Sequence, residues 1–196
     1  MKLRYLTLPL VAALAMGLSA CTKEEPASAA VTAIAIAPAQ AYDAVAAQAK
    51  GFTVGALMSA HTVYVLFDPQ CPHCGHLWNA ALPLLGQVKF VWVPVAIMGP
   101  KSLPQGAALM QAADPVATMS AHEQSVLSGQ GGMSASSSVP SDVAAAIQTN
   151  SNLLDRLGAD SVPFIVARHT RSGQTITRSG ALSTNALREF LGFAQP

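Results

Sequence analysis

The chain has 196 residues, of which 51% are apolar and 11% are charged, and its formal net charge is +1. This length suits one domain with a full hydrophobic core, and the apolar content excludes a chain that is disordered throughout. The sequence contains no basic stripe, no aromatic–basic interleaving and no acidic tail, so we expect no nucleic-acid partner.

Residues 1–20 have the pattern of an export signal. Lys2 and Arg4 supply a short positive region, and residues 5–20 are uncharged and mostly apolar. This apolar stretch is shorter than the roughly 20 residues that a helix needs to cross a bilayer. The pattern therefore predicts a cleaved signal peptide rather than a membrane-spanning helix.

The end of this segment, residues 18–21 (Leu-Ser-Ala-Cys), resembles the lipobox of bacterial lipoproteins. The resemblance implies that Cys21 is lipidated and becomes the first residue of the mature chain. Thr22 stands where lipoproteins held at the inner membrane commonly have Asp, which implies the inner leaflet of the outer membrane, facing the periplasm. Ordinary signal cleavage after residues 27–29 is the alternative.

After the signal, the sequence predicts a tether, a helix and a buried strand. Residues 21–40 are rich in Ala, Pro and Ser and lack periodicity, which is typical of a linker. Residues 41–50 favour a short helix that Gly51 ends. Residues 62–67 are β-branched and aromatic, so we expect a buried strand there, followed by a turn at residues 68–70.

Three prolines bear on the next two predicted elements. A helix is expected from residue 71 to about residue 85, with Pro72 in its first turn, where the missing N–H costs nothing. Pro83 lies near the end of this helix and is expected to kink it. A second strand is expected at residues 89–96, and its Pro94 indicates an edge strand or an irregular strand end.

The remaining elements complete an α/β pattern with two halves. In order, the sequence predicts a helix at 101–113, a mobile Gly/Ser/Met-rich loop at 129–140, a helix at 141–157 capped by Ser141 and Asp142, a strand at 162–167, a hairpin turn at 171–174 into a strand at 175–177, and a helix at 183–191 capped by Ser183 and Thr184. We therefore expect one α/β domain over residues 41–196, with a βαβ half, a ββα half and a helical insertion at about residues 100–158 between them.

The cysteines indicate the chemistry of this domain. The chain has three, Cys21, Cys71 and Cys74, so lipidation of the first leaves two that are separated by two residues. A disulfide between these two closes a very short loop and adds little stability by constraining the unfolded chain. In an oxidising compartment, a redox-active pair explains the spacing better than a structural disulfide, and we expect no other cofactor.

The position of the pair at a strand-to-helix junction gives a physical reason for its reactivity. A helix N-terminus carries free N–H groups and a partial positive charge, which stabilise a thiolate at Cys71 and lower its pKa. His73 adds to this effect by a hydrogen bond or, when protonated, by its charge. We therefore expect Cys71 to be the nucleophile and Cys74, one turn on, to be the resolving thiol in exchange with a disulfide, with Pro72 and His73 completing the site.

Other chemistries fit the motif less well. A zinc site would need a second Cys or His pair, and haem attachment would need His where Gly75 stands. Copper binding by the two thiols with His73 or His76 stays open, as does an interaction domain whose cysteine pair has lost its activity. No other metal site is expected, since the remaining histidines lack a supporting pattern: His61, His122 and His169.

Residues 68–74 (Asp-Pro-Gln-Cys-Pro-His-Cys), with Val162 and Pro163 far downstream, resemble the thioredoxin superfamily and, more narrowly, the periplasmic thiol:disulfide interchange (Dsb) proteins. The resemblance covers about residues 60–192 in element order. It implies a thioredoxin-like fold in which Pro163 is a cis-proline facing the cysteines and Val162 contacts the substrate chain, whereas statistics alone favour a trans bond. It also implies periplasmic protein thiols and disulfides as partners, and a redox partner in the membrane.

The resemblance divides between two branches of the Dsb proteins. The Cys-Pro-His-Cys motif and Val before Pro are similar to DsbA, the dithiol oxidase, but Val65 stands where thioredoxin and DsbA carry a buried acid. The Asp-Pro-x-Cys-Pro run and residues 98–102 are similar to the DsbC/DsbG branch. We therefore expect a DsbG-like reductase or isomerase, with a DsbA-like oxidase as the alternative. Only residues 21–70 precede the motif, so we expect a monomer without the dimerisation domain of DsbC and DsbG.

Overall fold

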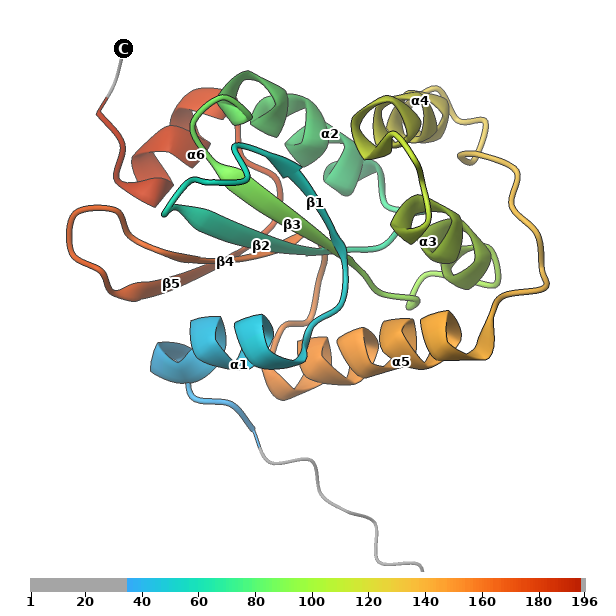
Figure 1. Ribbon diagram of the computed structural model, residues 1–196, viewed down its shortest axis with the longest axis horizontal. Coiled ribbons are helices and arrows are strands. Elements are labelled where there is room, and N and C mark those ends of the chain that lie inside the picture. The colour runs from blue at the N-terminus through green and yellow to red at the C-terminus, as the bar shows by residue number, and fades with distance from the viewer. Residues whose placement is uncertain (1–34, 195–196) are drawn as a thin grey trace, which may run out of the picture. The chain divides into compact units, whose positions relative to one another are not determined.

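Five strands form one mixed β-sheet in the computed structural model, which describes residues 35–194. The strands are β1 (Phe52–Gly55), β2 (Thr62–Phe67), β3 (Lys89–Pro94), β4 (Phe164–Arg168) and β5 (Thr175–Ser179). Their order across the sheet is β1-β3-β2-β4-β5 (Figure 1). β2 runs parallel to β3 and antiparallel to β4, and each outer strand is antiparallel to its neighbour.

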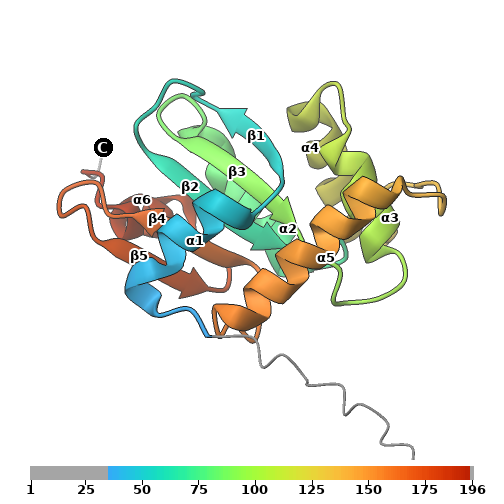
Figure 2. The ribbon, with the colours of Figure 1, turned by 60° about the horizontal axis from the view of Figure 1, so that its bottom comes forward.

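Helices cover both faces of this sheet. They are the short 3₁₀-helices η1 (Pro38–Gln40) and η2 (Leu82–Leu84) and the α-helices α1 (Ala41–Gln48), α2 (Pro72–Ala81), α3 (Ser102–Met110), α4 (Pro115–Leu127), α5 (Ser141–Arg156) and α6 (Thr184–Leu191). α1 and α5 lie across one face, as Figure 2 shows, whereas α2 and α6 cover the other (Figure 1). α4 packs beside α2, and α3 packs against both α4 and α5.

The connectivity confirms the predicted division of the domain. β2, α2 and β3 form a βαβ half, and β4, β5 and α6 form a ββα half. Three helices, α3, α4 and α5, lie between the two halves, in the region predicted as the helical insertion.

The central strand β2 delivers the cysteine motif to one edge of the sheet. It has a strand on each side and helices over both faces, so its side chains are apolar on both faces and Val63, Val65, Leu66 and Phe67 are buried. Because β2 and β3 are parallel, the chain leaves both strands at the same edge. Cys71 and the loop after β3 are therefore neighbours.

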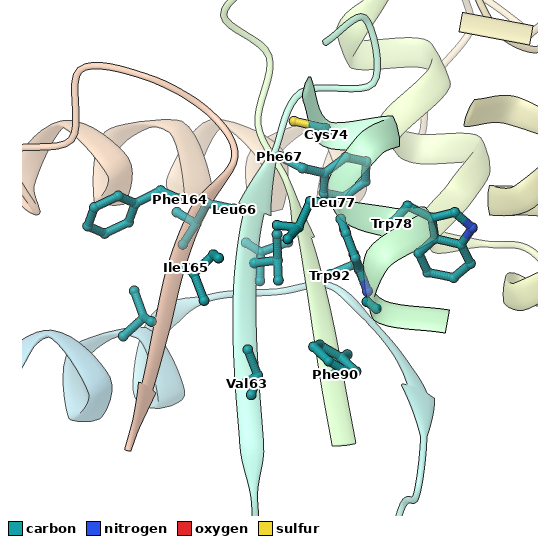
Figure 3. Packing of buried hydrophobic residues seen from close by; sticks show 14 of the residues in the cluster. Val63, Leu66, Phe67, Cys74, Leu77, Trp78, Phe90, Trp92, Phe164 and Ile165 are labelled. Atoms are coloured by element: carbon teal, nitrogen blue, oxygen red, sulfur yellow. The ribbon is translucent and has the colours of Figure 1, made fainter. Parts of the chain in front are cut away.

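An aromatic cluster fixes α2 onto the sheet directly below the motif (Figure 3). The ring centroids of Trp78 and Trp92 are 5.1 Å apart, and those of Phe67 and Trp92 are 5.4 Å apart, both in edge-to-face geometry. All three rings are completely buried. Because large buried rings leave little room for movement, this packing holds the N-terminal turn of α2, with Cys74, in a fixed position.

Three elements have no counterpart in the sequence-based prediction: η1, β1 and α4. β1 pairs with β3 and makes it an interior strand, so of the two interpretations of Pro94 the edge strand is wrong, whereas its place at the end of the strand agrees with the other. Pro94 is tolerated because it is the last residue of β3, and β1 pairs with β3 only as far as Trp92. The missing N–H of Pro94 therefore falls beyond the ladder between these two strands.

Helix ends also differ from the prediction at two places. α2 ends at Ala81 and continues as η2, which contains Pro83, so this proline ends the α-helix rather than kinking it. α5 begins at Ser141, but no side chain caps it and its N-cap residue is Pro140. The predicted cap of α6 is confirmed, because the Ser183 hydroxyl accepts a hydrogen bond from the Ala186 N–H at 3.3 Å.

The described part of the predicted tether contacts the domain. The Ile36 N–H donates a hydrogen bond to the Arg156 carbonyl at 2.7 Å, and η1 follows directly. Residues 35–40 are therefore part of the folded unit, which begins earlier than expected. The predicted signal peptide, the lipidation site Cys21 and the rest of the tether lie outside the described residues. No helix among the described residues is long and apolar enough to cross a membrane.

Candidate active site

Cys71 occupies the N-cap position of α2, directly after the turn that follows β2. Its backbone is extended (φ −92°, ψ 112°), and Pro72 is the first helical residue, as the motif predicts. The Cys71 side chain is 3% exposed and Cys74 is completely buried. Both are free thiols, so the structure shows the reduced form of the pair.

The two thiols have opposite acidities. The pKa of Cys71 falls to about 6, chiefly because the Cys74 side chain donates a hydrogen bond to it; burial opposes this, and the backbone N–H groups of Cys74 and His73 and the His73 charge add to the lowering. Burial raises the pKa of Cys74 well above its usual value, and the neighbouring Cys71 raises it further. At neutral pH the pair therefore consists of a thiolate at Cys71 and a thiol at Cys74.

Val162 and Pro163 face this pair from the start of β4. The peptide bond between them is cis, as the resemblance implies. The Cys71 sulfur lies 3.5 Å from the Val162 carbonyl oxygen, although the two residues are 91 positions apart in the sequence. The fold topology brings them together. Because β4 is antiparallel to β2, the start of β4 lies beside the end of β2, at the same edge of the sheet.

Asp68 anchors the turn that precedes Cys71. It is completely buried, and its carboxylate accepts hydrogen bonds from the Gln70 N–H (2.8 Å), the Ser102 hydroxyl (2.7 Å) and the N–H groups of Ile97 (2.8 Å) and Met98 (3.0 Å). These four donors satisfy the charge in the absence of a cation. The carboxylate therefore joins the cysteine loop to the loop after β3.

His122, on α4, supports the same turn from the opposite side. Its Nε2 lies 2.7 Å from the Pro69 carbonyl oxygen, and its Nδ1 accepts a hydrogen bond from the Met133 N–H at 3.1 Å. The ring is therefore the neutral tautomer with its proton on Nε2. Burial lowers the pKa of His122, which favours the same neutral form.

The Gly/Ser/Met-rich loop, which was expected to be mobile, is tied to this framework at its beginning. The Gln105 amide donates to the carbonyl oxygens of Gly131 (2.9 Å) and Met133 (2.8 Å), and the Gln70 amide donates to Gly131 (3.0 Å) and to the Gln105 side chain. Gly132 has φ +81°, and a Cβ there would lie 2.4 Å from the His122 ring. The close approach of loop and ring therefore requires glycine.

The two histidines of the motif region lie on the outer side of α2. His73 and His76 are exposed, with ring centroids 6.3 Å apart. Among residues 35–194, no group of three or more His, Cys, Asp or Glu side chains is placed to hold a metal ion.

The sequence is similar to known thiol:disulfide interchange proteins, although no family model matches it. It is 29% identical to the thiol:disulfide interchange protein DsbG of Pseudomonas aeruginosa over 132 residues, which are 66% of this chain and 50% of that protein. It is 31% identical to DsbG of Escherichia coli over 105 residues, which are 53% of this chain and 42% of that protein. The chain thus spans about half the length of the curated relatives that it matches.

Solved structures show the same fold. The catalytic domain of Proteus mirabilis ScsC superposes with a TM-score of 0.60 at 19% identity and covers 78% of this chain and 93% of that chain. The thiol-disulfide exchange protein α-DsbA2 of Wolbachia pipientis gives 0.59 at 18% identity and covers 79% and 94%. This chain therefore has the thioredoxin-like fold of these proteins and is similar in sequence to DsbG.

Three residues around the cysteines are not predicted by the sequence in the roles that the structure gives them. Asp68 is visible in the sequence only as part of the motif, and a lone acid directly after a buried strand is the signal for its bonding role. No sequence pattern points to His122 or Glu123. Both lie on α4, which was not predicted, and both are 1% exposed. A helix whose charged residues face inward gives no amphipathic signal that would have located them.

Proposed function

We propose that this chain is a thiol–disulfide oxidoreductase that exchanges disulfides with protein thiols through Cys71 and Cys74. The observation that carries the proposal is the division of acidity within the pair. A thiolate at Cys71 near neutral pH is the reacting form in thiol–disulfide exchange. Cys74 stays protonated and is available to resolve the mixed disulfide afterwards.

The reduced pair acts in two steps. The Cys71 thiolate attacks one sulfur of a substrate disulfide, which forms a mixed disulfide and releases the other substrate sulfur as a thiolate. Cys74 then attacks the Cys71 sulfur, releases the second substrate sulfur and leaves a Cys71–Cys74 disulfide. The oxidised pair runs the same steps in reverse, with a substrate thiolate attacking Cys71. Pro72 lets the helix begin directly after the nucleophile, and His73 adds positive charge beside it.

Val162 is the proposed contact for the substrate backbone. Its carbonyl oxygen already lies 3.5 Å from the reacting sulfur, so an extended chain bonded to Cys71 passes along the backbone before Pro163. In the mixed disulfide the Cys71 sulfur has no proton to donate, so an N–H of the substrate chain would supply the hydrogen bond to the Val162 carbonyl. Main-chain pairing of this kind accepts many sequences, which suits an enzyme with varied protein substrates.

The proposed setting is the periplasm, with a lipid anchor at Cys21 in the inner leaflet of the outer membrane. The export signal, the resemblance at residues 18–21 and the DsbG relatives support this location. Within the Dsb proteins we favour a DsbG-like reductase or isomerase that works as a monomer and exchanges electrons with a membrane redox partner.

A DsbA-like oxidase remains the second candidate, and the low pKa of Cys71 supports it. A stabilised thiolate favours the dithiol form, which makes the disulfide form a stronger oxidant. Equilibration with glutathione measures the reduction potential of the Cys71–Cys74 pair. A value of about −120 mV is compatible with both an oxidase and an isomerase. A value of about −270 mV indicates a reductant and excludes the oxidase.

Two variants test the exchange chemistry itself. Cys71→Ser should lose all turnover of a protein disulfide, because the nucleophile is gone. Cys74→Ser should accumulate mixed disulfides between Cys71 and the substrate, because the resolving thiol is gone. Retention of turnover by Cys71→Ser would refute the proposal.

A further inference from the structure

Glu123 is a buried carboxyl group without a hydrogen-bond partner. It lies on α4, its residue is 1% exposed, and neither carboxyl oxygen has a partner among the described residues. An ionised carboxylate in such a place carries a large desolvation penalty, and even a neutral one loses its hydrogen bonds with water. Because this burial lowers the stability of the folded protein, a role in the thiol–disulfide exchange at the neighbouring cysteines would explain it.

The carboxyl group points at the helix that carries the cysteines. α4 packs along α2, where the Trp78 indole N–H donates a hydrogen bond to the Ser120 hydroxyl at 3.0 Å. One turn further on, a Cβ at Gly75 would lie 2.8 Å from Oε2 of Glu123. Gly75 directly follows Cys74, so the absence of a side chain there lets the carboxyl group approach the backbone next to the buried thiol.

Among residues 35–194, no basic side chain forms an ion pair with Glu123. Among the titratable groups around it, Asp68 is occupied by four donors and His122 bonds to Pro69 and Met133. α3 and β1, which also pack against α4, carry no titratable side chain. His73 and His76 lie on the exposed side of α2.

The remaining titratable neighbours are Cys71 and Cys74. Burial, followed by the negative charges of Cys71 and Asp68, raises the pKa of Glu123 to about 9, so the group is a neutral carboxylic acid at pH 7. The Glu123 charge in turn raises the pKa of Cys74. The carboxylic acid is thus the stronger acid of the two buried groups, so a thiolate that forms at Cys74 takes up its proton readily.

Cys74 needs such a partner because it cannot exchange its proton with water easily. When the disulfide opens, its sulfur leaves as a thiolate inside the core, where a charge is costly. When the disulfide closes, its thiol must lose a proton before the sulfur can attack Cys71.

We propose that Glu123 donates the proton that Cys74 receives when the disulfide opens, and accepts it back when Cys74 attacks. This role rests on the proposed exchange through Cys71 and Cys74. In the opening step a substrate thiolate bonds to the Cys71 sulfur, and the Cys71–Cys74 bond breaks with its electron pair on Cys74. The Glu123 proton moves to that sulfur, which leaves a mixed disulfide, a Cys74 thiol and a Glu123 carboxylate. The closing step is the reverse.

Single-turnover opening of the disulfide tests the proposal directly. Oxidised wild-type protein and Glu123→Gln are mixed with excess glutathione, and the mixed disulfide at Cys71 is quantified by mass spectrometry after acid quenching. We expect the variant to open roughly a hundredfold more slowly at pH 7, which is the lower end of the range for general acid catalysis. Glu189→Gln, which removes an exposed carboxylate from α6, is the matched control and should open at the wild-type rate.

The pH profile separates proton transfer from a structural effect. After division by the thiolate fraction of glutathione, the wild-type rate should fall as the pH rises through the titration of Glu123, and the Glu123→Gln rate should not. Glu123→Asp, which keeps a carboxyl group, should recover part of the lost rate. Wild-type rates in Glu123→Gln at every pH would overturn the inference and leave the exchange through Cys71 intact, whereas turnover in Cys71→Ser would overturn both.

If Glu123→Gln fails to fold, time-resolved infrared spectroscopy of the wild-type protein during opening by glutathione decides instead. A protonated carboxyl band that is lost as the mixed disulfide forms supports the proton transfer. A protonated carboxyl band that stays constant while the mixed disulfide forms overturns it.

Discussion

The carboxylate of Asp68 and the hydroxyl of Ser102, 2.7 Å apart, join the turn before Cys71 to the first residue of α3. The same carboxylate holds the backbone of Ile97 and Met98, whose side chains are about half exposed. The loops that leave β2 and β3 are therefore one connected unit around a single buried charge. The position of Cys71 depends on that unit as well as on the helix that Cys71 begins.

Replacing Asp68 should destabilise the whole loop unit. Asp68→Ala removes four acceptor contacts and leaves backbone N–H groups without a partner, so we expect a loss of about 3 kcal/mol in the free energy of unfolding. Ser102→Ala removes one contact and should cost about 1 kcal/mol. Urea unfolding of the reduced variants measures both losses, and equal losses would contradict the central role of Asp68.

The acidity of Cys71 should depend more on Cys74 than on His73. In wild-type protein, alkylation by iodoacetamide should follow a titration with a midpoint of about 6. Cys74→Ala removes the largest cause of the lowered pKa and should move the midpoint up further than His73→Ala does. A larger shift in His73→Ala would show that charge outweighs the thiol–thiolate hydrogen bond.

Burial of Glu123 should make the folded protein lose stability as the pH rises. Its pKa is about 9 in the fold against a usual 4.5, so the folded state holds this proton more tightly than the unfolded state does. Between these values its contribution falls by at most about 1.4 kcal/mol per pH unit. Glu123→Gln should therefore be more stable than wild type at pH 8, with a difference that shrinks toward pH 4.5.

The prediction compares Glu123→Gln with wild type because Cys71, which is present in both proteins, changes the stability with pH in the opposite direction. Its pKa is lowered to about 6 from a usual 9, so its contribution to the stability of the reduced protein is full above pH 9 and is lost as the pH falls through 6. Between pH 6 and 9 the two slopes oppose each other in wild type. A pH-independent difference between Glu123→Gln and wild type would contradict the buried position of the carboxyl group.

Acidification should loosen the segment around Met133. The pKa of His122 is lowered in the fold, so its contribution to stability is full above its usual value of 6.5 and is lost as the pH falls below it. Protonation of Nδ1 removes the acceptor for the Met133 N–H. Hydrogen exchange of this amide, corrected for intrinsic rates, should lose protection as the pH falls below 6.5 toward the lowered pKa, and His122→Ala should lack that protection over the whole range. Equal protection in the variant would refute the support from His122.

The sequence predicted those parts of the fold and site that rest on contiguous patterns. The apolar run at 62–67, the motif at 68–74 and the Ser183 cap each contain their own signal within a few residues. The proximity of Val162 and Cys71 follows from the fold topology, and only the resemblance to the Dsb proteins suggested it in advance.

The sequence patterns of β1 and α4, which were not predicted, are either weak or place buried residues on the solvent side. β1 has four residues, one of them glycine, and depends on its pairing with β3 rather than on its own propensity. α4 buries His122 and Glu123, residue types that periodicity assigns to the solvent side. Its inward-facing charges follow from the surroundings of the cysteines and are not visible in its own sequence.

The side chains and loops outside the motif that hold the turn before Cys71 by hydrogen bonds come from one contiguous stretch of chain, residues 97–133, which includes the donors to Asp68, the His122 ring and the glycine loop. Two homologous proteins with an identical Cys-Pro-His-Cys tetrapeptide can therefore differ in thiol reactivity if this stretch differs. Natural variation or laboratory grafting within it offers a way to change the reactivity of Cys71 while the tetrapeptide stays the same.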